Sequence, residues 1–202
     1  VSWLEMAQFV NWLNTSAGHH PAYNFVGTQA TADYTFALWD AADAIDGSNL
    51  FRHKDAFYFL PTEDEWVKAA YWNGNELQDY GTLDGLEPNA GTESNYAQAI
   101  NQPWPVGSGS EELNGTFDMM GNVWELMEGM RYAGDPYDPG ADRAARGGGY
   151  SYNFYDNDLV SDNRGYSNPY YEAYGFRVAS VPEPATMSLL AMGGIALLRR
   201  KS

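Results

Sequence analysis

Few side chains in this sequence are of the kinds that perform covalent catalysis. The chain has no cysteine, which excludes disulfides, zinc–thiolate sites, iron–sulfur clusters and thiol nucleophiles, because all of them need sulfur. Of the three histidines, His19 and His20 are adjacent, point apart and are expected in a surface turn, and His53 has no evident partner for holding a metal. No serine or lysine lies in a nucleophile motif, and the glycines at 147–149 lack the strand-to-helix context of a phosphate loop.

Acidic side chains dominate the charge of the chain. It has 27 Asp and Glu against 11 Lys and Arg, and its formal net charge is -16. Such a surface repels phosphate backbones, so we expect no nucleic-acid partner. The same carboxylates offer hard oxygen ligands for divalent cations.

The length and composition predict one ordinary domain with a tail. A chain of 202 residues is long enough to bury a real core. It is 15% aromatic, contains 21 glycines and is only 19% charged. These values are typical of an aromatic-rich, turn-rich fold and not of a helical bundle. The chain starts without methionine and already within a helix-like pattern, so we expect a signal peptide and some N-terminal structure to precede it.

Two capping boxes predict two helices. Ser2 and Glu5 begin the first, which we expect to stop near Gly18, and Thr62 and Glu65 begin the second. The apolar residues expected on the inner faces are Met6, Phe9, Val10 and Leu13 in the first helix and Trp66, Ala69 and Ala70 in the second.

Short strands and long loops are expected elsewhere. The predicted strands cover residues 57–60, 117–126, 145–152 and 175–179. Residues 19–54 are expected to be mostly loop, and residues 73–114, rich in Gly, Asn, Asp, Pro and Ser, are expected to form a long ordered loop.

The composition changes abruptly after Ala179. A polar hinge at residues 181–186 is followed by an apolar run at 187–198 and a basic end at 199–201. The apolar run is shorter than the ~20 residues expected of a settled membrane span. This order favours a transient, processed anchor with a cytoplasmic-side stop.

Five motifs occur in the order seen in formylglycine-generating enzymes and sulfatase-modifying-factor domains. They are residues 1–3, 60–66 (LPTEDEW), 115–125 (GTFDMMGNVWE), 146–150 (RGGGY) and 175–177 (GFR). The chain therefore resembles that family over residues 1–179. The resemblance implies an α+β, irregular C-type-lectin-like fold with short helices, short twisted strands and long ordered loops, frequently stabilised by calcium.

The chain departs from the family at its catalytic centre. In active members, two cysteines after the arginine–glycine–glycine motif bind copper(I) and oxidise a sulfatase cysteine to formylglycine. Here Tyr152 stands near the first position and Asp156 or Asn157 near the second. Copper(I) needs soft ligands, which phenol, carboxylate and carboxamide groups do not supply. We therefore expect no copper and assign no catalytic residues.

The resemblance also implies calcium ligands. The family's calcium position corresponds to Asp118, Gly121, Val123 and Glu125, where side-chain and backbone oxygens would meet. The alternative is that Glu125 forms a buried salt bridge with Arg146 or Arg177. A second calcium site is possible at Asn95 and Tyr96, although the loop there looks shortened.

Other prominent residues are expected to be structural. Trp3, Trp66 and Trp124 lie inside family motifs and are expected in the core. Arg146, Arg164 and Arg177 are expected to tie loops to the core through carboxylates, with binding of an anionic substrate as the alternative.

The tail at residues 180–202 resembles a PEP-CTERM sorting signal, which exosortase systems recognise in Gram-negative bacteria. We therefore expect a sulfatase-modifying-factor-like domain at 1–179 that acts as a non-catalytic, extracytoplasmic binding or structural module. A polysaccharide or another surface protein would be its partner at the envelope or in the biofilm matrix. The alternatives are an oxidoreductase of the same superfamily with cysteine-independent chemistry and an inactive relative that binds sulfatases.

Overall fold

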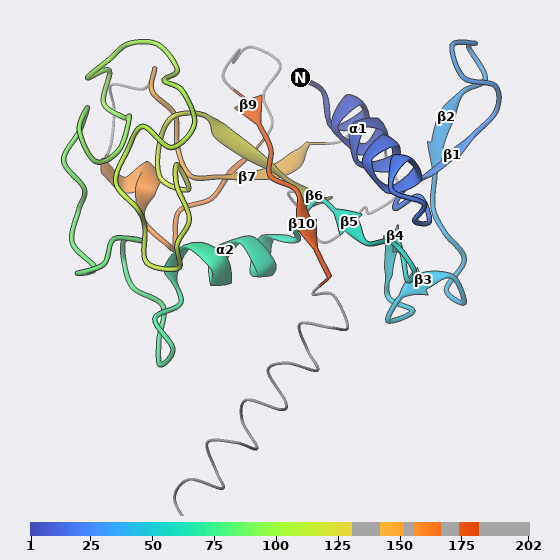
Figure 1. Ribbon diagram of the computed structural model, residues 1–202, viewed down its shortest axis with the longest axis horizontal. Helices are drawn as coiled ribbons and strands as arrows, with labels where there is room; N and C mark the ends of the chain where they lie inside the picture. The colour runs from blue at the N-terminus through green and yellow to red at the C-terminus, as the bar shows by residue number, and fades with distance from the viewer. Residues whose placement is uncertain (131–141, 152–155, 167–173, 182–202) are drawn as a thin grey trace, which may run out of the picture.

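The computed structural model describes residues 1–130, 142–151, 156–166 and 174–181, and Figure 1 shows their arrangement. Within these residues, short helices and strands form an irregular α+β fold. The elements are α1 (Trp3–Ser16), β1 (Asn24–Val26), β2 (Thr35–Ala37), β3 (Ala44–Ile45), β4 (Asn49–His53), β5 (Tyr58–Phe59), α2 (Glu63–Tyr71), β6 (Trp124–Met130), β7 (Arg143–Arg146), the 3-10 helix η1 (Asp156–Leu159), β8 (Gly165–Tyr166), β9 (Tyr174–Gly175) and β10 (Ala179–Ser180).

A small sheet with the strand order β8-β7-β6-β9 forms the centre of the molecule. Strand β6 pairs antiparallel with β7 and parallel with β9, and β7 pairs antiparallel with β8. The other strands form two hairpins, β1–β2 and β3–β4, and a short antiparallel pair that joins β5 to β10. Residues far apart in the sequence are therefore brought together at both edges of β6.

Both expected capping boxes are present. At the start of α1, Ser2 Oγ accepts a hydrogen bond from the Glu5 amide, and Glu5 Oε2 accepts one from the Ser2 amide at 2.7 Å. At the start of α2, Thr62 Oγ1 accepts from the Glu65 amide, and Glu65 Oε2 accepts from the Thr62 amide at 2.8 Å. Each box satisfies amides that the first turn of a helix leaves without a partner.

The core consists of two clusters, and strand β6 contributes to both. One cluster gathers aromatic residues around α1, and the other packs α2 against methionines. Leu126 belongs to the first and its neighbour Met127 to the second, because successive side chains of a strand point to opposite faces. Trp3 and Trp66 are buried, as expected, and the half-buried Trp124 packs against the first cluster.

The predicted inner faces of the helices are correct in part. Met6 and Val10 of α1 and Trp66 and Ala70 of α2 are buried. Phe9 is 42% exposed, because the buried face of α1 runs from Trp3 through Met6 and Val10 to Asn14, and Phe9 lies beside it. Ala69 of α2 is likewise exposed.

The strands differ from the prediction in extent. Residues 19–54, expected to be mostly loop, contain strands β1 to β4. Strands β1 to β3 have three residues or fewer, and β4 is buried at three successive positions, so none of them gives an alternating pattern. The strand expected at 117–126 begins only at Trp124 because Asp118, Gly121 and Asn122 have positive φ angles of 58°, 79° and 63°. Likewise, β7 ends at Arg146, directly before Gly147 with φ 93°.

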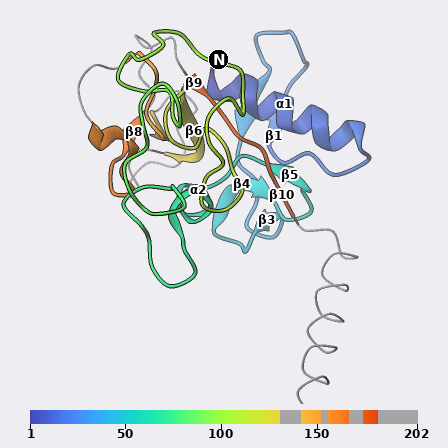
Figure 2. The same ribbon diagram turned by 60° about the vertical axis from the view of Figure 1, so that its left-hand side comes forward.

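The long ordered loop predicted at residues 73–114 is present, and it extends to residue 123. This segment has turns, bends and isolated bridges but no helix or extended strand. It lies at the end of the molecule away from α1 (green to yellow in Figure 1, and seen from another side in Figure 2). No helix among the described residues has the length and apolar character needed to cross a membrane.

Candidate functional site

Asp118 holds the loop that precedes the site. Its Oδ1 accepts a hydrogen bond from Trp104 Nε1 at 2.6 Å, and its Oδ2 accepts one from the Gly107 amide at 2.7 Å. Both oxygens are therefore engaged by N–H donors, which leaves each with one further lone pair for a cation.

Gly121 brings the two expected calcium positions together. It forms an isolated parallel bridge with Asn95, and the next residue, Asn122, donates its amide hydrogen to the Asn95 carbonyl at 2.7 Å. A Cβ at position 121 would lie 2.6 Å from the Asn95 carbonyl oxygen, so only glycine fits this approach. Asn95 and the segment from Asp118 to Glu125 thus border a single region.

Asn95 has an unusual combination of burial and hydrogen bonding. The residue is fully buried, and its Nδ2 donates to the Gln102 carbonyl at 2.9 Å and to Asn122 Oδ1 at 3.3 Å. Its Oδ1 is buried and accepts no hydrogen bond. An unsatisfied amide oxygen of this kind destabilises the fold by about 1–3 kcal/mol unless a ligand or water supplies a partner.

Tyr96, unlike Asn95, uses its side-chain oxygen in hydrogen bonds within the protein. Its hydroxyl donates to Glu87 and to the Pro88 carbonyl, and its own carbonyl accepts from the Ala99 amide at 3.1 Å. The side chain therefore ties the 87–88 turn to the core.

Glu125 is a buried carboxylate at the start of β6. It is 5% exposed, and its Oε2 accepts hydrogen bonds from Trp66 Nε1 at 2.6 Å and Arg177 Nε at 2.7 Å. Burial raises the pKa of Glu125 above its usual range, against the lowering effect of Arg177. The ion pair considered from the sequence is therefore observed with Arg177. The backbone of Val123, two residues earlier, follows the Asn122 turn, and its side chain packs close to Gly175.

The three arginines bind carboxylates and backbone carbonyls, as predicted. Arg146 and Arg164 both pair with Glu63, at 2.8 Å and 2.6 Å. Arg146 also donates to the carbonyls of Ser161 and Asn163. Arg177 Nη2 donates to the Phe117 carbonyl at 2.6 Å. These contacts tie the last third of the described chain to α2 and β6.

The positions that correspond to the family's cysteines are described only in part. Tyr152 lies outside the described residues. Asp156 and Asn157 begin the 3-10 helix η1, and only their backbone is described.

His19 and His20 are exposed and directly follow the turn at residues 17–18, as expected, but their rings also pack against other aromatic rings. His20 stacks on the buried His53 with ring centroids 3.5 Å apart, and Trp39 packs edge-on against His53 at 4.6 Å. Burial, and then the neighbouring His20, lower the pKa of His53. His19 stacks on Phe57 instead. Among the residues that the structure describes, no three His, Asp or Glu side chains are grouped to hold a metal.

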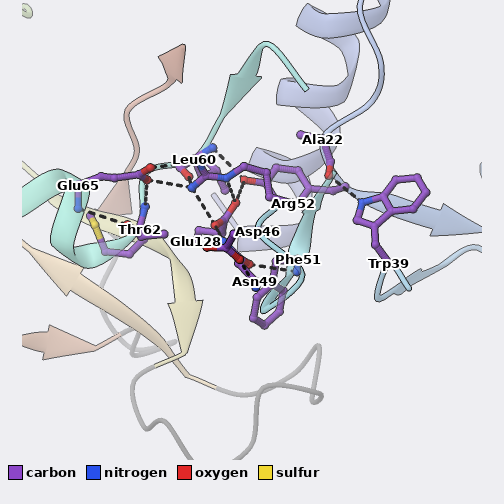
Figure 3. A network of polar contacts seen from close by, with 12 residues as sticks. Ala22, Trp39, Asp46, Asn49, Phe51, Arg52, Leu60, Thr62, Glu65 and Glu128 are labelled. Atoms are coloured by element: carbon purple, nitrogen blue, oxygen red, sulfur yellow. Dashed lines mark hydrogen bonds and ion pairs between the residues drawn. The ribbon is translucent and has the colours of Figure 1, made fainter. Parts of the chain in front are cut away.

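A buried ionic network surrounds Glu128 (Figure 3) and was not predicted from the sequence. This carboxylate is 1% exposed and accepts hydrogen bonds from Arg52, Tyr23 and Asn49. Arg52 also pairs with Glu65 at 2.8 Å. No local pattern marks the network, because its members come from segments far apart in the chain. Asn122 was missed too, although an asparagine after glycine is a signal for a positive φ angle.

Comparisons with known proteins agree with the fold and the motifs. The model of the sulfatase-modifying factor enzyme 1-like domain matches residues 1–181, and that of the PEP-CTERM protein-sorting motif matches residues 180–202. A search of curated proteins found no match.

Solved structures show the same fold at low sequence identity. Treponema denticola variable protein 1 superimposes with a TM-score of 0.66 and 22% identity, over 90% of this chain and 70% of that one. The crystal structure of CarF gives a TM-score of 0.59 and 21% identity, over 90% of this chain and 67% of that one. By its matching domain and its motifs, this chain belongs to the family of sulfatase-modifying factor enzyme 1-like domains and carries a PEP-CTERM sorting motif.

Proposed function

We propose that this protein is a non-catalytic binding or structural module that has kept the sulfatase-modifying-factor fold without its oxidation chemistry. The observation that carries the proposal is the lack of any cysteine in the 202 residues. The family's copper(I) chemistry uses cysteine thiolates, and the residues near those positions, Tyr152 and Asp156 or Asn157, offer only hard oxygen and nitrogen groups. The arginines that could have received an anionic substrate are engaged with Glu63 and Glu125.

The sorting motif gives the place of action. A PEP-CTERM motif directs a bacterial protein out of the cytoplasm to the cell envelope through exosortase recognition. We infer further that the host is Gram-negative and that the module works at the envelope surface or in the biofilm matrix. The net charge of the chain argues against a nucleic-acid partner there.

The non-catalytic role is tested with a peptide that carries a sulfatase cysteine. The protein is incubated with copper(I), oxygen and the peptide, and the peptide is analysed by mass spectrometry. We expect the cysteine to stay unmodified and the protein to bind no copper(I) tightly. Conversion of the cysteine to an aldehyde would contradict the proposal and support the alternative, an oxidoreductase with cysteine-independent chemistry.

We also propose that calcium binds beside Gly121. The unsatisfied Asn95 Oδ1 supports this, because calcium accepts carboxamide, carboxylate and carbonyl oxygens together. The donor set Asp118, Gly121, Val123 and Glu125 fits less fully, since N–H donors already occupy positions on both carboxylates. Of the two residues of the second expected site, Asn95 is the better calcium ligand. The hydroxyl and the carbonyl of Tyr96 are both already hydrogen-bonded.

A further inference from the structure

An open groove lies between helix α1 and the segment that runs from Pro21 through the β1–β2 hairpin to Trp39. Figures 1 and 2 show α1 beside this hairpin. The groove encloses about 410 Å³, which lies within the range of roughly 300–1,000 Å³ found for small-molecule sites. None of the candidate calcium ligands lines it, so the groove is separate from the site described above.

The lining of the groove is aromatic, polar and uncharged. Its aromatic members are Trp12, Phe25, Tyr34 and Trp39, together with Tyr23, whose own side chain is buried in the core. Its polar members are amide side chains and a threonine. No charged residue and no leucine, isoleucine, valine or methionine lines it. This composition is unusual in a chain with a net charge of -16.

Several of these rings are held in place before any ligand arrives. Trp39 Nε1 donates to the Ala22 carbonyl at 2.9 Å, and Figure 3 shows this contact. Tyr34 stacks on Phe25 with ring centroids 5.2 Å apart and an angle of 18° between the planes. Rigid, preorganised rings lose little conformational entropy when a ligand binds them.

Other groups of the groove are free to make contacts. Trp12 is 60% exposed. The carboxamides of Gln8 and Gln29 make no hydrogen bond with any described residue, whereas Asn11 uses its own on the Tyr23 backbone at 2.7 and 2.8 Å. Asn11 therefore positions the wall of the groove, and Trp12, Gln8 and Gln29 are available to a ligand.

We propose that this groove binds a neutral polysaccharide. The apolar C–H face of a sugar ring stacks on aromatic rings, and the hydroxyls at its rim both donate and accept hydrogen bonds, as carboxamides do. An acidic polysaccharide would be repelled by the net negative charge of the chain. A lipid would require an aliphatic lining. This inference rests on the proposed function, a binding module of the cell envelope, and names the class of its ligand.

A proline-rich peptide is the competing ligand, because such peptides also dock in aromatic grooves. A run of prolines has no N–H donor, so it offers only carbonyl oxygens to the carboxamides of Gln8 and Gln29. Sugar hydroxyls match both the N–H and the C=O of each carboxamide. The uncharged amides of the groove therefore favour the polysaccharide.

The test is affinity electrophoresis of the whole protein in native gels that contain hydroxyethyl cellulose, laminarin, dextran, galactomannan or alginate. We expect retardation by at least one of the four neutral polymers and none by acidic alginate. Trp12→Ala should weaken the interaction roughly tenfold or more, since an aromatic anchor contributes on the order of 1–2 kcal/mol. Gln29→Ala, on an exposed turn, should weaken it less. Trp72→Ala is the matched control, because Trp72 is 36% exposed and lies outside the groove.

Each result decides a separate point. If no neutral polymer retards the protein, the polysaccharide assignment is wrong. It is also wrong if a polyproline peptide binds the protein and no neutral polymer displaces the peptide. If retardation persists unchanged in Trp12→Ala, the groove is not the site, although the binding function stands. Oxidation of the sulfatase peptide would overturn the non-catalytic proposal and leave the groove result unaffected.

Discussion

Asn95 is the residue where the calcium proposal can be tested most directly. It is fully buried, its Oδ1 has no hydrogen-bond donor, and its backbone carbonyl accepts from Asn122. The sequence suggested a calcium ligand here only through the family resemblance. It could not show that Asn95 lies beside Gly121, because this bridge joins residues from separate turns of a long loop.

We expect calcium to raise the melting temperature of the protein. An ion that binds only the folded state at ~100-fold above its Kd adds about 2.7 kcal/mol to the free energy of unfolding, which corresponds to several degrees for a domain of this size. Asn95→Ala should abolish this increment, because its unsatisfied Oδ1 supports the site, and Asp118→Ala and Glu125→Gln should reduce it. Asp84→Asn, a change at an exposed acid, should keep it. Tryptophan fluorescence would be used to record the melting curves. If the curves with calcium and with chelator are equal, calcium does not bind here, and Glu125 is only a structural partner of Arg177.

Among the elements, the helices were predictable from the sequence and most strands were not. The capping boxes at Ser2 and Thr62 are local signals, because the cap and its partner are three residues apart. Strands β8, β9 and β10 have two residues each. Such strands exist because a distant segment pairs with them, so their own residues carry no pattern. For the same reason, the Arg52 and Glu128 network was not visible in the sequence.

That network joins strand β4, helix α2 and strand β6, and it makes a prediction at the scale of elements. Arg52→Met removes the cation from Glu128, whose side chain is 1% exposed. A buried charge that loses its partner costs about 3–5 kcal/mol, so the free energy of unfolding in urea should fall by that amount.

The matched control is Lys54→Met. Lys54 follows β4, and its ion pair with Asp43 has both side chains about half exposed, at 46% and 52%. Pairs of this kind contribute about 0–1 kcal/mol. The double variant Arg52→Met with Glu128→Gln should recover part of the loss, because it removes the uncompensated charge. Equal destabilisation by Arg52→Met and Lys54→Met would show that the network is not a distinct source of stability.

At the scale of the whole molecule, two parts of the sequence match known families. The family motifs specify the fold over residues 1–181, and the tail motif specifies sorting. The proposal that the module is non-catalytic rests on the lack of cysteine in these 202 residues. The aromatic groove follows from tertiary packing, since Trp12 and Trp39 look like ordinary apolar residues in the sequence.

Sorting should depend on the prolines of the tail motif. Replacing Pro182 and Pro184 by alanine in the full-length protein should leave it unprocessed in the inner membrane of its host, because the exosortase system would no longer recognise the signal. Fractionation and immunoblotting of the host would measure this, with Thr186→Ala in the same hinge as the control. Identical mature, released forms of the native protein and the proline variant would refute the dependence.

The long ordered loop at residues 73–123 affects the far-ultraviolet circular dichroism spectrum of the protein. Its backbone is held by turns and by hydrogen bonds such as the one from the Asn122 amide to the Asn95 carbonyl. Circular dichroism in the far ultraviolet responds to repeating helix and strand geometry, which this segment does not have. A fully native sample should therefore give a weak spectrum that resembles that of an unfolded chain. Tryptophan emission, to which the buried Trp3 and Trp66 contribute, would therefore be a better test of folding than ellipticity.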